Sequence, residues 1–416
     1  MLKWIWPTTF ALLLSFSWSM MAQVQRPTGL PSSPTQRGLV DADPVSISTG
    51  IYYRVYKDLY VKDTIPIDFV RTQRNMDPRS RSFGVGGSTS YDMFIIGDVK
   101  KFSWVALVMA DGGQVKYSRV SPGTGVLDGV FEDKDDAGEF LGSRISWNGR
   151  GGWSVKLRDG REYTVQGCGP PSKPGQCAVT DIKNASGEHL TIQRDRDGNI
   201  LRISSPHGHF IDIKHDTAGH IVHAQDDSGH WVNYSYDEKG CLARSFNWRG
   251  DAQLFRYDSR FNMIWVHEKG RHGRDGLGPY EFTVSNRYGA DDRFASQVVS
   301  NGDRYSASYH TDAQARIRQT DVEDNYSSAS YFFDEGGYLI REEFYRDNQL
   351  KWTLEYHFVP ETHKRLNTTL SCGTRKTFLP PTFGYKIAQL GEAHKPFISE
   401  MCRRSATAKP SSEKKN

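Results

Sequence analysis

The sequence predicts an all-β protein in which tandem β-hairpins form one extended, twisted or partly spiralled antiparallel sheet. Two observations carry this prediction: a turn sequence recurs every 21 residues, and apolar residues alternate with polar residues before each turn. A fixed period of this length is typical of repeat proteins. The composition agrees, because aromatic residues make up 12% of the chain and no long stretch shows the period of a helix.

An aspartate begins each recurring turn, a glycine follows three residues later, and an apolar residue follows two residues after that. The aspartates are Asp195, Asp216, Asp237 and Asp258, with further copies at Asp312 and Asp334. The glycines are Gly198, Gly219, Gly240 and Gly337, and Phe261 takes the glycine place after Asp258. Asp bonds nearby backbone groups and Gly tolerates positive φ, so these residues are expected to form turns. Their regular spacing makes them structural rather than catalytic.

Each repeat is expected to be a β-hairpin, because 21 residues hold two strands and two short turns. A lone hairpin is not stable in water, so neighbouring repeats must pair edge to edge into one sheet. Aromatic residues at one position of the repeat should then form a ladder on one face. They are Tyr234, Phe255 and Tyr331, with Tyr236, Tyr257 and Phe333 two residues further on.

Changes in composition divide the chain into segments. We expect a signal peptide at 1–22, a linker at 23–38, an N-terminal β domain at 39–98, connecting hairpins at 99–186, the repeats at 187–366, a C-terminal segment at 367–404 and a disordered basic tail at 405–416. A Gly/Arg/His-rich insertion at 269–279 breaks the repeat register. Counting back one period from Asp312 puts the next copy at Asp291, a degenerate copy because Phe294 and Ser296 take the glycine and apolar places.

The first 22 residues have the charge, the short apolar run and the final small residues of a signal peptide. Export is therefore expected, with no membrane-spanning segment after cleavage; an uncleaved N-terminal anchor is the alternative. The net charge of +4 is small and includes the basic tail, so a nucleic-acid partner is not predicted.

Five cysteines are present. Cys168 and Cys177 bracket a loop rich in Gly and Pro and are expected to pair in an oxidising compartment. Cys372 and Cys402 are expected to form a second pair that pins the C-terminal segment. Cys241 is left without an assigned partner, and the alternative is that all five cysteines are unpaired.

Candidate chemical sites are few. His209 and His230 stand one repeat apart within a histidine-rich stretch, and they are weak candidates for a zinc or copper site. The structural interpretation is stronger, because the histidines fall on ordinary turn and strand positions of the repeat. No nucleophile elbow, phosphate loop or His-Glu-x-x-His motif occurs. The sequence therefore predicts no catalytic residue, metal or cofactor, although a glycosidase-type carboxylate pair is not local in sequence and stays open.

The repeats resemble the YD repeats of bacterial RHS proteins and of the teneurin shell. The family pattern is Tyr-Asp, two variable residues, Gly, one variable residue and Leu. It is reproduced by Tyr236, Asp237, Gly240 and Leu242. The second match is Phe333, Asp334, Gly337 and Leu339. The resemblance implies a bacterial protein with a β-shell type of fold. Together with the expected signal peptide, it predicts a secreted or periplasmic protein.

A second resemblance is independent of the first. Asp-Pro-Val at 43–45, Thr-Gly at 49–50, Ile-Pro-Ile at 65–67 and Arg-Thr at 71–72 occur in the order found in a small domain of unknown function that precedes RHS repeats. Gln73 and Gly87 replace two aromatic residues of that pattern.

The departures from the family limit what the resemblance implies about function. RHS proteins enclose a C-terminal toxin in a shell of many more repeats, and end the shell with a core motif and an aspartyl self-cleavage site. Neither is visible in this sequence. We therefore expect a non-enzymatic exported scaffold that binds a cell-surface glycan or a protein. An accessory or remnant shell component of a toxin system is the alternative, and an exported hydrolase is the third.

Overall fold

The computed structural model describes residues 40–41, 45–98, 101–109, 112–133, 140–166, 177–271, 278–359, 365–380 and 394–407. The predicted signal peptide and linker lie outside these residues. So do Cys168, residues 272–277 of the predicted insertion and residues 408–416 of the predicted tail.

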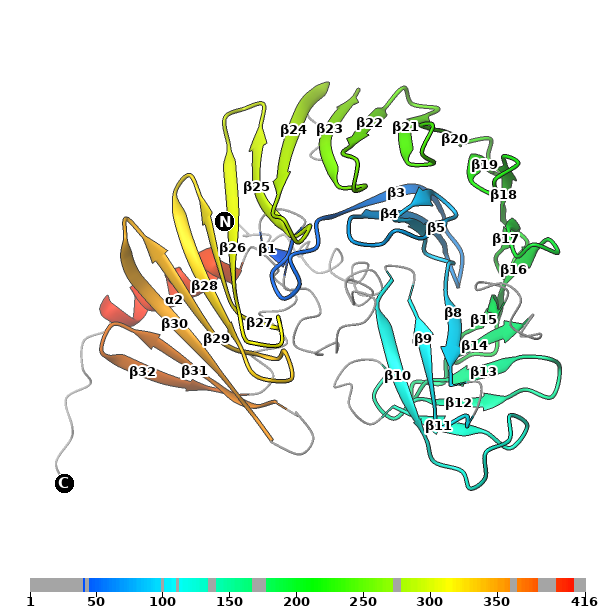
Figure 1. The fold of residues 1–416 in the computed structure, drawn as a ribbon, viewed down its shortest axis with the longest axis horizontal. Helices are drawn as coiled ribbons and strands as arrows, with labels where there is room; N and C mark the ends of the chain where they lie inside the picture. Colours follow the sequence, from blue (N-terminus) through cyan, green and yellow to red (C-terminus); the bar gives the residue numbers. More distant parts are fainter. Residues whose placement is uncertain are drawn as a thin grey trace, which may run out of the picture.

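One long antiparallel sheet organises most of the chain (Figure 1), and the predicted all-β hairpin fold is confirmed. From β8 to β32 the strands pair in chain order. The first eight strands are β8 (Phe94–Gly97), β9 (Trp104–Val108), β10 (Gln114–Arg119), β11 (Val130–Glu132), β12 (Arg144–Trp147), β13 (Trp153–Lys156), β14 (Glu162–Gln166) and β15 (Ala178–Lys183). The next nine are β16 (His189–Arg194), β17 (Ile200–Ser204), β18 (Phe210–His215), β19 (Ile221–Asp226), β20 (Trp231–Tyr236), β21 (Leu242–Asn247), β22 (Ala252–Tyr257), β23 (Met263–Gly270) and β24 (Tyr280–Tyr288). The last eight are β25 (Phe294–Val299), β26 (Arg304–Thr311), β27 (Ile317–Asp324), β28 (Ser327–Phe333), β29 (Leu339–Arg346), β30 (Gln349–Phe358), β31 (Arg365–Cys372) and β32 (Arg375–Leu379).

The first eight strands close into a ring because β15 has three neighbours. It pairs with β14 and β16, and its first residue, Ala178, also pairs with Phe94 of β8. Two backbone hydrogen bonds hold this closure, from Val179 N to Met93 O (2.9 Å) and from Ile95 N to Cys177 O (3.2 Å). From β16 onward the sheet leaves the ring and follows a wide arc (Figure 1).

Residues 45–92 form an inner segment on the concave side of this arc (Figure 1). Its strands are β2 (Val45–Ser46), which pairs with β1 (Val40–Asp41), then β3 (Tyr53–Val61), β4 (Ile67–Arg74), β5 (Ser80–Arg81), β6 (Gly84–Val85) and β7 (Gly87–Thr89). Backbone hydrogen bonds join the inner segment to the sheet at three places: Ile221 N to Ser82 O (2.8 Å), Val85 N to Gly240 O (3.0 Å) and Phe294 N to Gly50 O (2.8 Å). The N-terminal β segment is thus packed inside the repeats.

The repeat aspartates begin the turns of successive hairpins. Asp237 is representative: its Oδ1 accepts hydrogen bonds from Lys239 N and Cys241 N, both at 2.9 Å, and Gly240 N donates to Asp237 O at 3.0 Å. The turn shifts the strand register by one residue beside Tyr236, as expected for a three-residue hairpin loop that ends in a left-handed residue and a bulge. The same two bonds to Oδ1 recur at Asp195, Asp216, Asp258 and Asp312, and Asp334 accepts one from Tyr338 N.

The glycine place of this turn requires positive φ. Gly198, Gly219, Gly240 and Gly337 have φ between 78° and 89°. Phe261 and Ala315 take the same place without being glycine, and their φ values are 65° and 60°. The conformation is therefore imposed by the hairpin rather than by the residue that occupies it.

The second turn expected in each repeat lies at the other end of the strands, and it has the same form as the first, which was not predicted. They begin at Asn184, Ser205, Asp226 and Asn247 and contain Gly187, Gly208, Gly229 and Gly250. In each, the glycine N–H donates to the carbonyl of the first residue. These residues also recur every 21 positions, so the signal was present but was carried by three different residue types.

The predicted copy at Asp291 is wrong in register. Gly289 stands at the aspartate place, because Gly289 N donates to Arg293 O (2.8 Å) and Asp292 N to Gly289 O (3.2 Å). Asp292 takes the left-handed place with φ 63°. Phe294 takes the apolar place and pairs with Tyr288, as Leu242 pairs with Tyr236. Counting back from Asp312 failed because this repeat is two residues longer than the others.

The predicted aromatic ladder lies on the concave face and is buried in the core. Tyr234, Phe255, Tyr331 and Phe333 are all at most 5% exposed. Residues at the tyrosine place of the repeat also tie neighbouring hairpins together. Their hydroxyls donate to a backbone carbonyl of the preceding hairpin: Tyr236 to Ile221 O (2.6 Å), Tyr257 to Leu242 O (3.1 Å) and Tyr288 to Met263 O (2.7 Å).

The C-terminal segment continues the sheet and ends in a helix that the sequence analysis did not predict. After β31 and β32 comes α2 (His394–Thr407), so residues 405–407 of the predicted disordered tail are helical. The predicted disulfide between Cys372 and Cys402 joins β31 to α2. Cys177 is also disulfide-bonded, and Cys241 is a buried free cysteine. In the part of the chain that the structure describes, no helix has the length and apolarity needed to cross a membrane.

Candidate binding face

Alternation along β27 separates the two faces of the sheet. Thr320 and Val322 are buried, and Thr320 Oγ1 donates to Ile47 O of the inner segment at 2.5 Å. Asp321 and Glu323 therefore point to the opposite, convex face, which we call the outer face. The inner segment packs on the concave face at this strand, and the outer face of the same strand lines the described hollows.

The contact between the inner segment and the sheet is centred on Arg71, which is fully buried. Its Nε and Nη2 donate to the carboxylate of Asp58 at 2.8 and 3.1 Å, and Nη2 also donates to Ser245 Oγ and Gln253 Oε1 of the sheet. Burial alone would lower the pKa of Arg71, but the Asp58 carboxylate raises it above its usual value. Tyr234 OH donates to the same carboxylate at 2.7 Å. Among the described residues Arg71 Nη1 has no hydrogen-bond partner, but the guanidinium lies over the Tyr56 ring, 4.4 Å from its centroid. The cluster joins the inner segment to the sheet.

The repeat aspartates do not form a common site. They lie in separate turns, one for each hairpin, and their carboxylates accept hydrogen bonds from their own turns. Burial would raise the pKa of Asp195, but hydrogen bonds from the Asn199 side chain and from the Asn199 and Asp197 backbone lower it. Hydrogen bonds from Arg316 and Gln314 lower the pKa of Asp312 in the same way against the effect of burial.

His209 and His230 are each held by a single nearby carboxylate. His209 Nδ1 lies 2.6 Å from Asp227 Oδ2, and His230 Nδ1 lies 2.9 Å from Asp226 Oδ2. The ring of His230 also stacks on Trp248 with centroids 4.2 Å apart. Among the described residues, no three His, Cys, Asp or Glu side chains are grouped so as to hold a metal ion.

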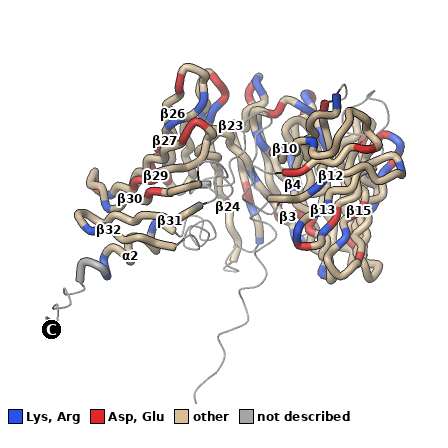
Figure 2. The backbone as a smooth tube through the Cα atoms, turned by 90° about the horizontal axis from the view of Figure 1, so that it is seen from below, with Lys and Arg blue, Asp and Glu red and all other residues tan. Residues whose placement is uncertain are grey.

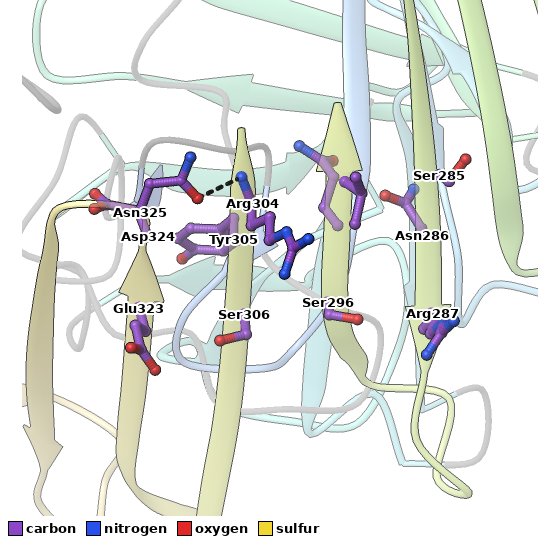
Figure 3. Close-up of a pocket in the computed structure, with 12 residues that line it drawn as sticks. Ser285, Asn286, Arg287, Ser296, Arg304, Tyr305, Ser306, Glu323, Asp324 and Asn325 are labelled. Atoms are coloured by element: carbon purple, nitrogen blue, oxygen red, sulfur yellow. Dashed lines mark hydrogen bonds between the residues drawn. The ribbon is translucent and has the colours of Figure 1, made fainter. Parts of the chain in front are cut away.

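The outer face carries a groove made of three adjoining hollows that run over β24 to β29. The largest has a volume of about 630 Å³ (Figure 3), and all three share Glu323 in their lining. We call this feature the outer groove. Small hydroxyl side chains line its middle, and they are Ser306, Ser308, Ser328 and Ser330.

The strand register explains why the outer groove is polar. Across β26, β27 and β28, a carboxylate stands between two serines: Ser308, Asp321 and Ser330 are partners in one row. Ser306, Glu323 and Ser328 are partners in the next row. Serine side chains are short, so the surface is hollow where they lie and rises again at Tyr345, the partner of Ser328.

Asp321 is held in its charged form. Its carboxylate accepts hydrogen bonds from Ser330 Oγ (2.6 Å) and Gln319 Nε2 (2.8 Å) and lies 2.7 Å from His310 Nε2. Burial would raise the pKa of Asp321, but these contacts lower it below its usual value. A carboxylate fixed in this way accepts hydrogen bonds from a ligand and is poorly suited to donate a proton at neutral pH.

Tyr345 closes one side of the outer groove as a neutral hydroxyl. Its OH donates to Glu343 Oε2 at 2.6 Å, and this hydrogen bond, followed by burial, raises the pKa of Tyr345 to about 12. Glu343 Oε1 also lies 3.2 Å from Arg341 Nε. The register places the serine row between Glu343 and Asp321, so the two carboxylates are not adjacent.

The opposite end of the outer groove is basic. Arg287 of β24 and Arg304 of β26 both line the largest hollow, and both side chains are exposed. Figure 3 shows Arg304 extending from its strand toward the neighbouring strand, while Asn325 Oδ1 accepts a hydrogen bond from Arg304 N at 3.0 Å. Charges of both signs therefore line the groove. Figure 2 shows basic and acidic positions in the backbone close to β26 and β27.

Arginines stacked on aromatic rings occupy other parts of the outer face. Each guanidinium lies within about 6 Å of its ring centroid, the range of cation–π contacts. The pairs are Arg202 with Phe210, Arg244 with Phe246, Arg256 with Trp265 and Arg341 with Phe332. These rings are half-buried, unlike those of the buried ladder.

The residues of the outer groove were not predicted from the sequence. The available signal was weak: serines recur two residues apart at 306 and 308 and at 328 and 330, which places each pair on one face of a strand. Only the pairing of β26 with β28 through β27 brings the two pairs together.

Comparison with known proteins gives one family match. Residues 42–117 match a domain of unknown function, DUF6531. This range takes in the inner segment, β8 and β9, and it supports the resemblance drawn from residues 43–87. The YD-repeat assignment of the later strands stays a prediction. No curated protein sequence matches the chain.

Among solved structures, the chain is similar to the crystal structure of TcdB2-TccC3-TEV, with 9% identity over 79% of this chain and 22% of that chain and a TM-score of 0.36. It is also similar to the Photorhabdus luminescens Tc holotoxin pore, with 8% identity, coverage of 80% and 20%, and a TM-score of 0.31. The chain spans about a fifth of the length of these two chains. Identities and TM-scores this low assign no activity or partner.

Proposed function

We propose that this chain is an exported, non-enzymatic scaffold that binds a cell-surface glycan in the outer groove. The observation that carries the proposal is the row pattern of serine hydroxyls and carboxylates across β26, β27 and β28. Sugars present hydroxyl groups that both donate and accept hydrogen bonds, so they match a surface of hydroxyl donors and charged acceptors. Tyr345 adds a ring at the side of the groove, and rings of this kind offer an apolar face with a polar tip.

The shape of the molecule supports the same proposal. The described inner segment packs on the concave face of the strands that it contacts. The outer groove is open along several strands, and an extended polymer fits such a surface better than a small compact ligand.

The direct test is binding of surface polysaccharides by the purified full chain, measured by calorimetry. Ser328→Trp should fill the outer groove and abolish binding. Ser235→Trp is the matched control, because Ser235 is an exposed serine on the outer face of β20, away from the groove, and this variant should bind as the wild type does.

The non-enzymatic part of the proposal has its own test. Incubation with the bound polymer should release no new reducing ends. Release of reducing ends that disappears in Asp321→Asn or Glu343→Gln would instead support a hydrolase.

A second function, that of an accessory shell component of a toxin system, is favoured by one observation. In the described part of the chain, the one pairing register of β32 is with β31, and Phe378 on this strand is 75% exposed. An edge strand of this kind can pair with a strand of another chain. Co-purification from the native host would identify such a subunit, and it should be lost on Phe378→Pro, because the backbone N–H of residue 378 faces the open edge and proline removes it.

A further inference from the structure

The basic end of the outer groove is positively charged, and a neutral glycan has no anionic group that would pair with this charge. Arg287 and Arg304 both line the largest hollow, and within the described residues neither guanidinium has an ion-pair partner, unlike Arg202, Arg316 and Arg341. An exposed arginine without a carboxylate partner keeps its donors available for a ligand.

The strand register places these arginines around a small hydroxyl-lined floor. Arg287 is in one row with Ser296 and Ser306, across β24, β25 and β26. Arg304 is in the adjacent row with Val298 and Ser285. Val298 is 48% exposed, so the floor offers one apolar contact between hydroxyl groups. The two arginines thus approach the hollow from strands on either side of β25.

We propose that this end of the outer groove is a subsite for an anionic group on the glycan, so that the ligand is an acidic polysaccharide. This inference rests on the proposed function. Guanidinium groups bind carboxylate, sulfate and phosphate oxygens through charge-assisted hydrogen bonds, and the serine hydroxyls add neutral donors. The sugar ring that carries the anion packs over Val298.

The acidic part of the groove sets the position of the anion along the chain. Glu323 is the partner of Ser306 and is exposed at the centre of the three hollows. A second anionic group beside Glu323 would be repelled, whereas hydroxyl groups would be accepted. The groove therefore favours a polymer in which an acidic unit is followed by neutral units.

The experiment compares polygalacturonate with the same polymer after its carboxyl groups are reduced to neutral alcohols, using the full chain and calorimetry at fixed salt. The wild type should bind the acidic polymer more tightly than the neutral one. Arg287→Gln and Arg304→Gln should each weaken binding of the acidic polymer about tenfold, as expected for the loss of one charge-assisted contact. Both changes should weaken binding of the neutral polymer much less than binding of the acidic polymer.

Two further variants serve as a control and as a change with the opposite expected effect. Arg150→Gln removes an exposed arginine in a turn far from the groove and should leave binding unchanged. Glu323→Gln should strengthen binding of the acidic polymer, because it removes the opposing charge. Galacturonate monomer, added as a competitor, shows whether the anion alone is enough; full competition at equal concentration of carboxyl groups would overturn the assignment of a polymer.

The anionic subsite and glycan binding in the outer groove can be tested separately. Equal binding of both polymers, with no effect of either arginine change, would overturn the anionic subsite and leave glycan binding in the groove intact. Binding of neither polymer would count against both.

Discussion

At the scale of single residues, the hairpin turn decides which side chains the repeat needs. The Asp side chain accepts two backbone N–H groups, and the residue three positions later must adopt positive φ. Both demands are local, so the sequence predicted the aspartate and glycine positions directly. The copy at Gly289 was misplaced because the turn there forms without its aspartate, and only the backbone bonds identify it.

Ala315 gives a direct test of the turn geometry. Ala315→Gly should stabilise the protein by about 0.5–1 kcal/mol, because a left-handed backbone costs an L-residue about 1–2 kcal/mol and glycine costs about 0.5–1 kcal/mol in chain entropy. Gly240→Ala should destabilise it by about 1 kcal/mol for the opposite reason. Urea denaturation measures both. A loss of stability in Ala315→Gly would contradict the assignment of strain to this position.

Protonation of Asp77 should lower the free energy of unfolding at acid pH. Its buried carboxylate pairs with Arg74, with Arg79 (3.1 Å) and with Arg81 (3.3 Å). Burial would raise the pKa of Asp77, but these guanidinium groups lower it from 3.8 to about 2. Because the folded-state pKa lies below the unfolded value, the stabilisation is complete above pH 3.8 and is lost as the pH falls through 2.

Asp77→Asn should therefore remove about 2–3 kcal/mol of the acid-dependent change in unfolding free energy. Asp159→Asn is the control, since Asp159 pairs with Arg161 at an exposed turn. Urea titrations between pH 5 and pH 2 should show a flatter profile only for Asp77→Asn. The same slope in both variants would exclude the role given to Asp77.

At the scale of elements, periodic patterns were predictable and single elements were not. The period of two in each strand and the 21-residue recurrence identify hairpins without any knowledge of tertiary contacts. Helix α2 occurs once, and its position depends on contacts with distant strands. His394 Nε2 lies 2.7 Å from Glu342 Oε1, Trp352 Nε1 donates to Ser399 Oγ at 3.1 Å, and Cys402 is bonded to Cys372. Only the cysteine spacing gave a hint of this attachment.

The disulfide should account for much of the stability of α2. Cys402→Ser opens a loop with a sequence separation of 30 and should cost about 2–4 kcal/mol. Hydrogen exchange should then speed up in residues 394–407 and in β31, while β16 to β22 keep their protection. Reduced wild type should behave like Cys402→Ser, and the variant itself should not respond to reductant. Unchanged exchange in α2 would show that the His394 and Trp352 contacts suffice.

At the scale of the whole molecule, the inner segment and the sheet depend on each other. The sequence predicted both as separate regions, but it gave no sign that one lies inside the other, because the contacts join residues far apart in the chain. Arg71 and Ser245 are an example, as are Tyr56 and Glu268, whose side chains meet at 2.7 Å. The outer groove was unpredictable for the same reason, since it depends on which strands become neighbours.

Substitution of Arg71 tests whether the inner segment and the sheet stabilise each other. Arg71→Met leaves the Asp58 carboxylate buried without its cation and should cost about 3–5 kcal/mol. The double change Arg71→Met with Asp58→Asn should recover part of this loss, because no unpaired charge remains. Urea denaturation gives the energies, and limited proteolysis of residues 45–92 reports whether the inner segment has come loose. Equal stability of the single and double variants would contradict the idea that the charge of Arg71, paired with Asp58, holds the inner segment to the sheet.

The placement of the inner segment also has a consequence for the order of assembly. Residues 45–92 precede in the chain all the strands that enclose them, so they are synthesised first. Their apolar side chains stay without a partner until the hairpins that follow have arrived. The later hairpins then add one after another around a surface that is already present, and a break anywhere in that series leaves the earlier residues exposed to proteases and to neighbouring chains.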